Sequence, residues 1–297
     1  MSNTSNSDRE EYQSGFIGSG DDMRVNVGGL MSDKYSNITL IHGSGFSHFV
    51  LYSAIRYGKR YILKGISQKY QSDPLYQALL AKEFDLGISL DHPNIRRTIG
   101  FEHIDEIGNV IVLEYVDGES LEDAIRDKRL NQESGMSVLA QVAEALEYLE
   151  RRQVLHRDIK PANIMLTHSG MYAKLIDFSH ADAESFVMLK DSAGTNRYIA
   201  PEIIGNSTTP SVRTDIYSFG MVAKDVAESV GNDSLKEIAH RCCNVNPQLR
   251  PGSFTGILTP SIMNRLLSGL KNLFASKILT LFLFLTLIAI WIYIFSL

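Results

Sequence analysis

Residues 156–163 read His-Arg-Asp-Ile-Lys-Pro-Ala-Asn, and residues 175–179, after a short predicted strand, read Leu-Ile-Asp-Phe-Ser. The two stretches place Asp158, Asn163 and Asp177 on loops close to strand ends. Carboxylate and amide oxygens are the hard ligands that Mg²⁺ prefers in proteins. This ordered set of two carboxylates and one amide therefore predicts a magnesium site in the middle of the chain.

Short apolar runs upstream of this stretch predict β-strands at residues 38–41, 49–55 and 60–66. The turn between the first two strands contains Gly43, Ser44 and Gly45. Glycines in such a turn let backbone N–H groups approach phosphate oxygens without interference from a Cβ atom. The turn is therefore a candidate phosphate-binding loop.

Lys64 lies near the end of the third predicted strand, in the apolar run Tyr-Ile-Leu-Lys. An ammonium group in a buried strand is costly unless it has an anionic partner. Glu83 lies on the segment that follows, a predicted helix over residues 75–90. The sequence therefore offers Glu83 as the partner of Lys64.

The order of these motifs resembles that of the eukaryotic-type serine/threonine protein kinase family, and the resemblance covers residues 33–252. It also rests on His-Pro-Asn-Ile at 92–95, Ala-Pro-Glu at 200–202, Thr-Asp-Ile-Tyr-Ser-Phe-Gly at 214–220 and Leu-Arg-Pro at 249–251. The resemblance implies an α+β, bilobal protein-kinase-like fold with a small β-rich N-lobe and a mainly helical C-lobe. It further implies that Asp215 braces the catalytic loop and that Arg250 pairs with Glu202.

The resemblance also implies roles in catalysis. Asp158 would accept the proton of the substrate hydroxyl, and Lys160 would neutralise charge on the transferring phosphoryl group. Asn163 and Asp177 would bind Mg²⁺ or Mn²⁺. A lysine two residues after the catalytic aspartate is typical of Ser/Thr rather than Tyr kinases. The implied reaction is transfer from ATP to a Ser or Thr hydroxyl of a protein substrate.

A nucleotide site is implied in the same way. Lys64 would hold the α- and β-phosphates of ATP, and Glu83 would orient Lys64. The other implied nucleotide contacts are Gly43, Ser44, Gly45, Val50, Ser120 and the backbone of Glu114 and Val116, with Leu113 at the gatekeeper position.

The sequence departs from the family pattern at several places. His48 stands where the third glycine of the phosphate-binding loop is usual, and Ser179 replaces a glycine next to the metal-binding motif. Gly87 and Thr98 occupy positions where large aliphatic side chains usually connect the lobes, unless Leu86 fills that gap. Thin packing there would lower the stability of the closed conformation.

The C-lobe also departs from the family pattern, because fewer residues than usual separate Asp215 from Arg250. We expect the helix that usually supports docked protein substrates to be short or absent around residues 230–234. This shortening leaves room for a kinase that acts on a small molecule. A second alternative is a catalytically silent pseudokinase that serves as a membrane-tethered binding module, although the chain keeps Lys64, Asp158 and Asp177.

Residues 278–297 contain no charged side chain. Twenty helical residues rise about 30 Å, the thickness of the bilayer hydrocarbon core, so this stretch predicts a transmembrane helix in contact with membrane lipid. Arg265, Lys271 and Lys277 precede it without an intervening acid, which predicts a C-terminal anchor with the kinase domain in the cytoplasm. The apolar spacing between Ile262 and Phe274 fits a helix on the membrane surface or one packed on the domain.

The rest of the domain division follows from composition. Residues 1–32 are rich in Ser, Asn, Gly and Asp, which predicts a disordered tail. We expect the N-lobe at 33–116, the C-lobe at 117–256 and a juxtamembrane segment at 257–277.

Charge and cysteine content exclude other classes. The net charge of −5 over 297 residues argues against a nucleic-acid partner, which would favour a basic excess. The two cysteines, Cys242 and Cys243, are adjacent, which favours free buried thiols in a reducing compartment.

Activation depends on residues 181–200. Asp191 stands where related kinases commonly carry a phosphorylated residue, and its carboxylate could pair with Arg157. The alternative is that Ser192 is phosphorylated instead.

Overall fold

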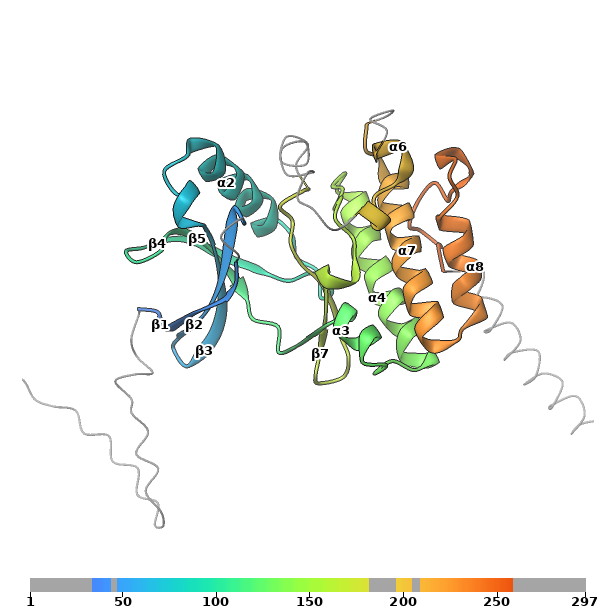
Figure 1. The fold of residues 1–297 in the computed structure, drawn as a ribbon, viewed down its shortest axis with the longest axis horizontal. Helices are drawn as coiled ribbons and strands as arrows, with labels where there is room; N and C mark the ends of the chain where they lie inside the picture. Colours follow the sequence, from blue (N-terminus) through green and yellow to red (C-terminus); the bar gives the residue numbers. More distant parts are fainter. Residues whose placement is uncertain (1–33, 44–46, 182–195, 205–208, 259–297) are drawn as a thin grey trace, which may run out of the picture.

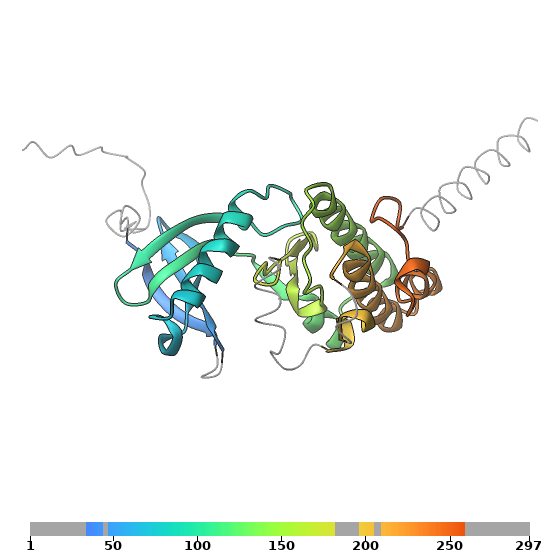
Figure 2. The same cartoon turned by 90° about the horizontal axis from the view of Figure 1, so that it is seen from above.

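The computed structural model describes residues 34–43, 47–181, 196–204 and 209–258, which form two lobes (Figures 1 and 2). The β-rich N-lobe ends with strand β5 (Gly108–Glu114), and the C-lobe begins with strand β6 (Gly118–Ser120). The bilobal architecture confirms the fold expected from the sequence. The predicted tail at 1–32 and the predicted membrane helix at 278–297 lie outside the described residues.

The N-lobe consists of an antiparallel sheet in the order β1-β2-β3-β5-β4 with one long helix packed on it. Its elements are β1 (Ser36–His42), β2 (Phe49–Arg56), β3 (Lys59–Ile66), the helical turn η1 (Gln68–Tyr70), α2 (Pro74–Ile88) and β4 (Thr98–Ile104). The three predicted strands and the predicted helix are therefore confirmed. Asp73 caps α2 by accepting a hydrogen bond from Leu75 N, and Pro74 suits the first helical turn.

Strand β3 is the middle of this sheet and fixes the position of Lys64. Its last five residues, Ile62–Ile66, are buried, and Lys64 pairs in register with Leu51 of β2 and Ile111 of β5. Ile62 and Ile66 pack towards α2, whereas Leu63 packs with the opposite face of the sheet. The alternation of a strand thus directs Lys64 to the same side as α2.

The C-lobe is mainly helical, with its largest core around helix α7 (Val212–Val230). The other elements are α3 (Leu121–Arg126), α4 (Gln132–Arg151), η2 (Pro161–Asn163), β7 (Ile164–Thr167), β8 (Ala173–Leu175), η3 (Asn196–Tyr198), α6 (Pro201–Ile204), α8 (Asp233–Cys242) and η4 (Pro247–Leu249). Ile257 and Leu258, which the sequence analysis placed in the juxtamembrane segment, are buried in this core. The C-lobe therefore extends to at least Leu258.

The connection between α7 and α8 is two residues long. Gly231, with φ of 66°, ends α7 in the left-handed conformation, and the Asn232 side chain caps α8 by accepting a hydrogen bond from Leu235 N. Within residues 209–258, no other helix separates α7 from α8. The expectation of a missing or short helix near residues 230–234 is therefore confirmed, and α8 packs directly on α7 (Figure 1).

The cysteines follow the sequence expectation. Both thiols are free, and Cys242 is buried while Cys243 is half-buried. Burial raises the pKa of Cys242 to about 12 and that of Cys243 to about 11, so neither thiol is a reactive nucleophile at neutral pH. Of the helices that the structure describes, none has the length and apolar character needed to cross a membrane.

A buried ion pair joins α6 to the end of the C-lobe. Arg250 donates Nη1 to Glu202 Oε1 at 2.7 Å and Nη2 to Glu202 Oε2 at 2.8 Å, and its side chain is fully buried. Arg250 also donates to the backbone oxygens of Arg213 and Asn244. The pairing of Arg250 with Glu202 is therefore confirmed.

Replacing Arg250 with Gln should destabilise the protein strongly, because it leaves the Glu202 carboxylate buried without its cation. We expect a loss of about 3–5 kcal/mol in the free energy of unfolding, measured by urea titration. The matched control is Lys236→Gln, which breaks the exposed pair with Asp233 and should leave the free energy of unfolding almost unchanged. Equal losses in the two variants would contradict this account.

Candidate active site

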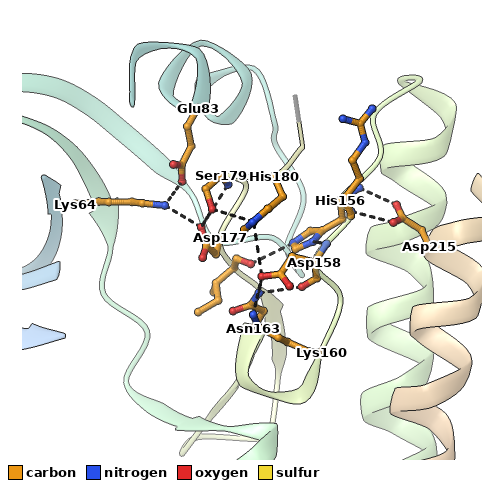
Figure 3. Close-up of polar contacts among 12 residues, drawn as sticks. Lys64, Glu83, His156, Asp158, Lys160, Asn163, Asp177, Ser179, His180 and Asp215 are labelled. Carbon is orange, nitrogen blue, oxygen red and sulfur yellow. Dashed lines mark hydrogen bonds and ion pairs between the residues drawn. The ribbon is translucent and has the colours of Figure 1, made fainter. Parts of the chain in front are cut away.

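Lys64 is the cation at the centre of the site (Figure 3). Its Nζ lies 2.7 Å from Glu83 Oε1 on α2 and 2.8 Å from Asp177 Oδ1 in the C-lobe. Burial alone would lower the pKa of Lys64, but the two carboxylates raise the pKa above its ordinary value. The predicted partnership of Lys64 and Glu83 is confirmed, and the structure adds Asp177 as a second partner.

The two carboxylates around Lys64 respond differently to burial. Burial raises the pKa of Glu83, although the neighbouring Lys64 acts in the opposite direction. Burial acts on Asp177 as well, but Lys64 and a hydrogen bond from Ser179 hold the pKa of Asp177 well below its usual value. Asp177 is therefore a carboxylate over the whole physiological range, as a metal ligand must be.

Asp158 and Asn163 lie on the loop that leads through η2 into β7. Asn163 Nδ2 donates to the Asp158 backbone oxygen at 2.9 Å and to Asp158 Oδ2 at 2.7 Å. Lys160 Nζ lies 2.8 Å from the same Oδ2. His180 Nδ1 approaches Asp158 Oδ2 to 3.8 Å from the segment after Asp177 (Figure 3). Of the predicted site residues, Lys160 and Asn163 thus both contact the Asp158 carboxylate.

Ser179 binds the same oxygen of the Asp177 carboxylate that Lys64 contacts. Its hydroxyl donates to Asp177 Oδ1 at 2.8 Å, and its backbone N–H donates to the same oxygen at 3.3 Å. Asp177 itself has φ of 66°, a left-handed conformation that is strained for a non-glycine residue. The sequence marked Ser179 only as the loss of a glycine, whereas the structure gives it a contact with the predicted metal ligand.

Asp215 of helix α7 binds the backbone of the catalytic loop. Asp215 Oδ2 accepts a hydrogen bond from His156 N at 2.7 Å, and Asp215 Oδ1 accepts one from Arg157 N at 2.9 Å. Burial raises the pKa of Asp215 to about 6, while these two N–H groups act in the opposite direction. The predicted bracing role of Asp215 is confirmed, and it is the link between the C-lobe core and Asp158.

The predicted nucleotide contacts are placed only in part. Val50 is buried, and a Cβ atom on Gly43 would lie 2.7 Å from Val50 Cγ1, so only glycine fits there. Glu114 and Val116 lie at the junction of the lobes, where the Glu114 side chain accepts from Lys174 Nζ at 3.0 Å. Ser44 and Gly45 lie outside the described residues.

Ser120, which is expected near the ribose, also has a structural role. Its hydroxyl caps α3 by accepting a hydrogen bond from Asp123 N at 3.1 Å, and it donates to Asp123 Oδ2 at 2.7 Å. A serine at the start of a helix with an acid three residues later is a recognisable capping pattern. Asp191 and Ser192, the two candidates for ordering the activation segment, lie outside the described residues.

The expected gap between the lobes is filled by a close contact. A Cβ atom on Gly87 would lie 2.3 Å from Thr98 Oγ1, so the threonine occupies the space that a side chain at residue 87 would need. The cavity beside them is only about 10 Å³, and Leu113 lies on its wall. Leu86 of α2, the alternative residue for filling the gap, packs on the C-lobe core. The prediction of thin packing is therefore wrong at this contact.

Arg96 is a charged residue of the site that sequence reasoning missed. It lines the same small cavity as Glu83 and Asp177, next to Thr98. Burial lowers the pKa of Arg96, while the charges of Asp177, Glu83 and Glu114 act in the opposite direction. The signal that could have found it was a basic residue two positions before strand β4, next to the buried Ile95.

Comparison with known proteins places this geometry in a family. Residues 41–230 match the model of the protein kinase domain. A probable serine/threonine-protein kinase of Streptomyces coelicolor is 32% identical over 219 residues, which cover 70% of this chain and 32% of that protein. The serine/threonine-protein kinase PrkC of Bacillus subtilis is 29% identical over 200 residues, covering 66% of this chain and 30% of PrkC. The chain belongs to the protein kinase family.

A solved structure shows the same fold. The crystal structure of the Mycobacterium tuberculosis PknI kinase domain, a double mutant, superposes with a TM-score of 0.58 at 22% identity, over 76% of this chain and 93% of that one. The chain spans about a third of the length of the curated relatives it matches, with 32% and 30% of the first two covered. Protein kinases in general use ATP and a divalent metal ion.

The donor set fits a magnesium ion. Mg²⁺ in phosphoryl-transfer sites is held by one or two carboxylates together with substrate phosphates, and it keeps several waters. Asp177 supplies a permanently ionised carboxylate, and Asn163 supplies an amide oxygen while its Nδ2 donates to Asp158. The hydrogen bond from Asn163 Nδ2 to Asp158 therefore fixes the orientation of the Asn163 side chain, including its Oδ1 atom.

His156 gives the site a testable pH dependence. Burial lowers the pKa of this histidine to about 4, against an ordinary value of 6.5. Its neutral ring uses both nitrogens, since Nδ1 accepts from Asp158 N at 3.3 Å and Nε2 donates to the Ile176 oxygen at 3.1 Å. Between the two pKa values the unfolded chain binds a proton that the folded protein excludes, so stability falls as the pH falls through this window.

We expect His156 to remove about 2 kcal/mol from the free energy of unfolding between pH 6.5 and pH 5. The measurement is urea unfolding of the wild type and of His156→Phe at both pH values, in which the Phe variant should show a smaller loss. The control His103→Phe, at an exposed position of β4, should keep the wild-type loss. A His156→Phe protein with the full wild-type pH dependence would refute this role.

Proposed function

We propose that this chain is an ATP- and Mg²⁺-dependent protein kinase that transfers the γ-phosphoryl group of ATP to Ser or Thr hydroxyls. The observation that carries the proposal is the contact of Lys64 with both Glu83, at 2.7 Å, and Asp177, at 2.8 Å. Lys64 bound to Glu83 is the arrangement in which this lysine can reach the phosphates. The similarity to serine/threonine kinases supports the choice of acceptor.

The roles of the residues follow from their contacts. Lys64 holds the α- and β-phosphates and is oriented by Glu83, while Gly43 and Val50 border the nucleotide. Asp177 and Asn163 hold the metal ion, which neutralises charge on the phosphates when it is bound. Mn²⁺, which also prefers carboxylate and water ligands, would suit the same two side chains.

Asp158 positions the acceptor hydroxyl and takes its proton. Its Oδ2 is held by Asn163 Nδ2 at 2.7 Å and by Lys160 Nζ at 2.8 Å, so the carboxylate has one orientation. Lys160 in turn carries the positive charge that faces the transferring phosphoryl group. These contacts favour an active kinase over a silent binding module, because they keep the lysine, the proton acceptor and the metal ligand in one cluster.

We also propose that the kinase domain is tethered to a membrane on its cytoplasmic side. The support is the uncharged run at residues 278–297, preceded by Arg265, Lys271 and Lys277. A helix of this length matches the hydrocarbon thickness of a bilayer. The partner is then membrane lipid, and the protein substrate is one that meets the domain at that surface.

Asp158→Asn should bind Mg·ATP as the wild type does but lose phosphoryl transfer by a factor of about 10² to 10⁴. The reason is that Asp158 contacts the acceptor and not the nucleotide. Binding is measured by calorimetry, and transfer is measured with radiolabelled ATP and a generic Ser/Thr substrate protein. The control Asp233→Asn alters an exposed carboxylate on α8 and should keep full transfer. Equal transfer by Asp158→Asn and wild type would refute the kinase proposal.

Full-length protein should stay in the membrane pellet after an alkaline carbonate wash, because residues 278–297 insert into the hydrocarbon region. Deletion of these residues should release a protein that is still active, since the residues assigned to the site lie between Gly43 and Asp215. A second variant, Leu285→Lys with Leu287→Lys, should also be released, because each charge opposes insertion by about 2.5–3.5 kcal/mol. Full-length protein in the supernatant would refute the anchor.

A further inference from the structure

His48 is packed against aromatic side chains of the N-lobe helix region. Its ring stacks on Tyr76 of α2, with centroids 4.8 Å apart and planes at 17°. It also lies 4.8 Å from the ring of Tyr70 in η1, tilted by 55°. Tyr70 and Tyr76 are themselves 4.8 Å apart, so the three rings form one cluster. A histidine at the tip of a solvated loop would show none of these contacts.

The backbone at His48 is anchored as well. The His48 oxygen accepts a hydrogen bond from Ser67 N at 2.9 Å, just beyond the end of β3. The next residue, Phe49, begins β2 and pairs in register with Ile66. The end of the connection from β1 to β2 is thus held by the sheet through its backbone and by α2 through the His48 ring.

The same cluster reaches Lys64 through Phe49. The Phe49 and Tyr76 rings lie 6.2 Å apart in an edge-to-face arrangement. Lys64 Nζ lies 5.3 Å from the centroid of the Phe49 ring. Tyr76 is two turns before Glu83 on α2, and Glu83 binds Lys64 at 2.7 Å. His48 is therefore connected with the phosphate-binding lysine in two ways. One connection runs through the rings of Tyr76 and Phe49, and the other runs along α2 from Tyr76 to the ion pair of Glu83 with Lys64.

We propose that His48 is a positioning residue that fixes the end of the phosphate-binding loop to α2. The proposal rests on the proposed function, since it assigns a nucleotide-dependent task to the loop. With glycine at residue 48, only the hydrogen bond from Ser67 N and the pairing of β2 would hold this point before nucleotide binds. The ring stack orders the loop end beforehand, which reduces the entropy lost on binding.

An aromatic pair of this geometry contributes enough to change a dissociation constant about two- to tenfold. His48→Gly should therefore raise the dissociation constant of Mg·ADP by that factor and raise the KM for ATP more than it lowers kcat. Tyr76→Leu should do the same, because it removes the other ring of the stack. His48→Phe keeps an aromatic ring and should restore nucleotide affinity to within about twofold.

The effects of the His48 and Tyr76 substitutions on nucleotide affinity should not add. In a double-mutant cycle, His48→Gly combined with Tyr76→Leu should weaken Mg·ADP binding little more than either change alone. The matched control is Tyr57→Leu, at an exposed tyrosine in the turn after β2, far along the strand from His48. Tyr57→Leu should leave the dissociation constant for Mg·ADP unchanged, so loss of any N-lobe aromatic is separated from loss of this contact.

The outcomes distinguish this inference from the proposed function. Wild-type affinity in His48→Gly, strictly additive effects in the cycle, or a lower unfolding temperature with no change in affinity would each overturn the positioning role. Nucleotide binding by the wild type without phosphoryl transfer would overturn the kinase proposal. The double-mutant cycle could still be interpreted in that case, because it measures nucleotide binding. A wild type that binds no nucleotide would overturn both.

Discussion

A single buried ammonium group constrains the arrangement of the two lobes. Lys64 is 5% exposed and meets one carboxylate from α2 and one from the C-lobe. An isolated charge at this depth would be unstable, so Lys64 needs a carboxylate beside it. Sheet, helix and C-lobe loop must therefore approach one another in one geometry. That requirement positions Asp177, and through Asp177 it positions the proposed metal site relative to strand β3.

The sequence was sufficient where a charged group had a partner that its burial or the family resemblance could indicate. Lys64 with Glu83, Arg250 with Glu202, and Asp215 beneath the catalytic loop are all observed as expected. In each case a buried ionic or polar group needs a partner, and the ordered motifs supply one. The three N-lobe strands were also predicted, because short apolar runs separated by glycine-containing turns indicate strands, and helix α2 was predicted close to its observed bounds.

The contacts that the sequence did not indicate depend on how side chains meet across elements. Ser179 was read as a missing glycine, yet its hydroxyl binds Asp177 Oδ1 at 2.8 Å. The sequence marks His48 only as the loss of a third loop glycine, yet the His48 ring stacks on Tyr76. Gly87 and Thr98 were read separately as two losses, although each is the reason the other fits. Such complementarity is a property of a pair, and neither member shows it alone.

These departures share a physical consequence. A glycine beside Asp177 and one at the end of the phosphate-binding loop would leave both backbones free to move. In this chain Ser179 ties one segment to Asp177, and His48 ties the other to α2. Both segments thus have fewer conformations open to them before nucleotide arrives. The active arrangement is then favoured by contacts within the N-lobe and within the catalytic cluster. The short α7–α8 connection lies outside these contacts, so the lack of a helix there does not disturb them.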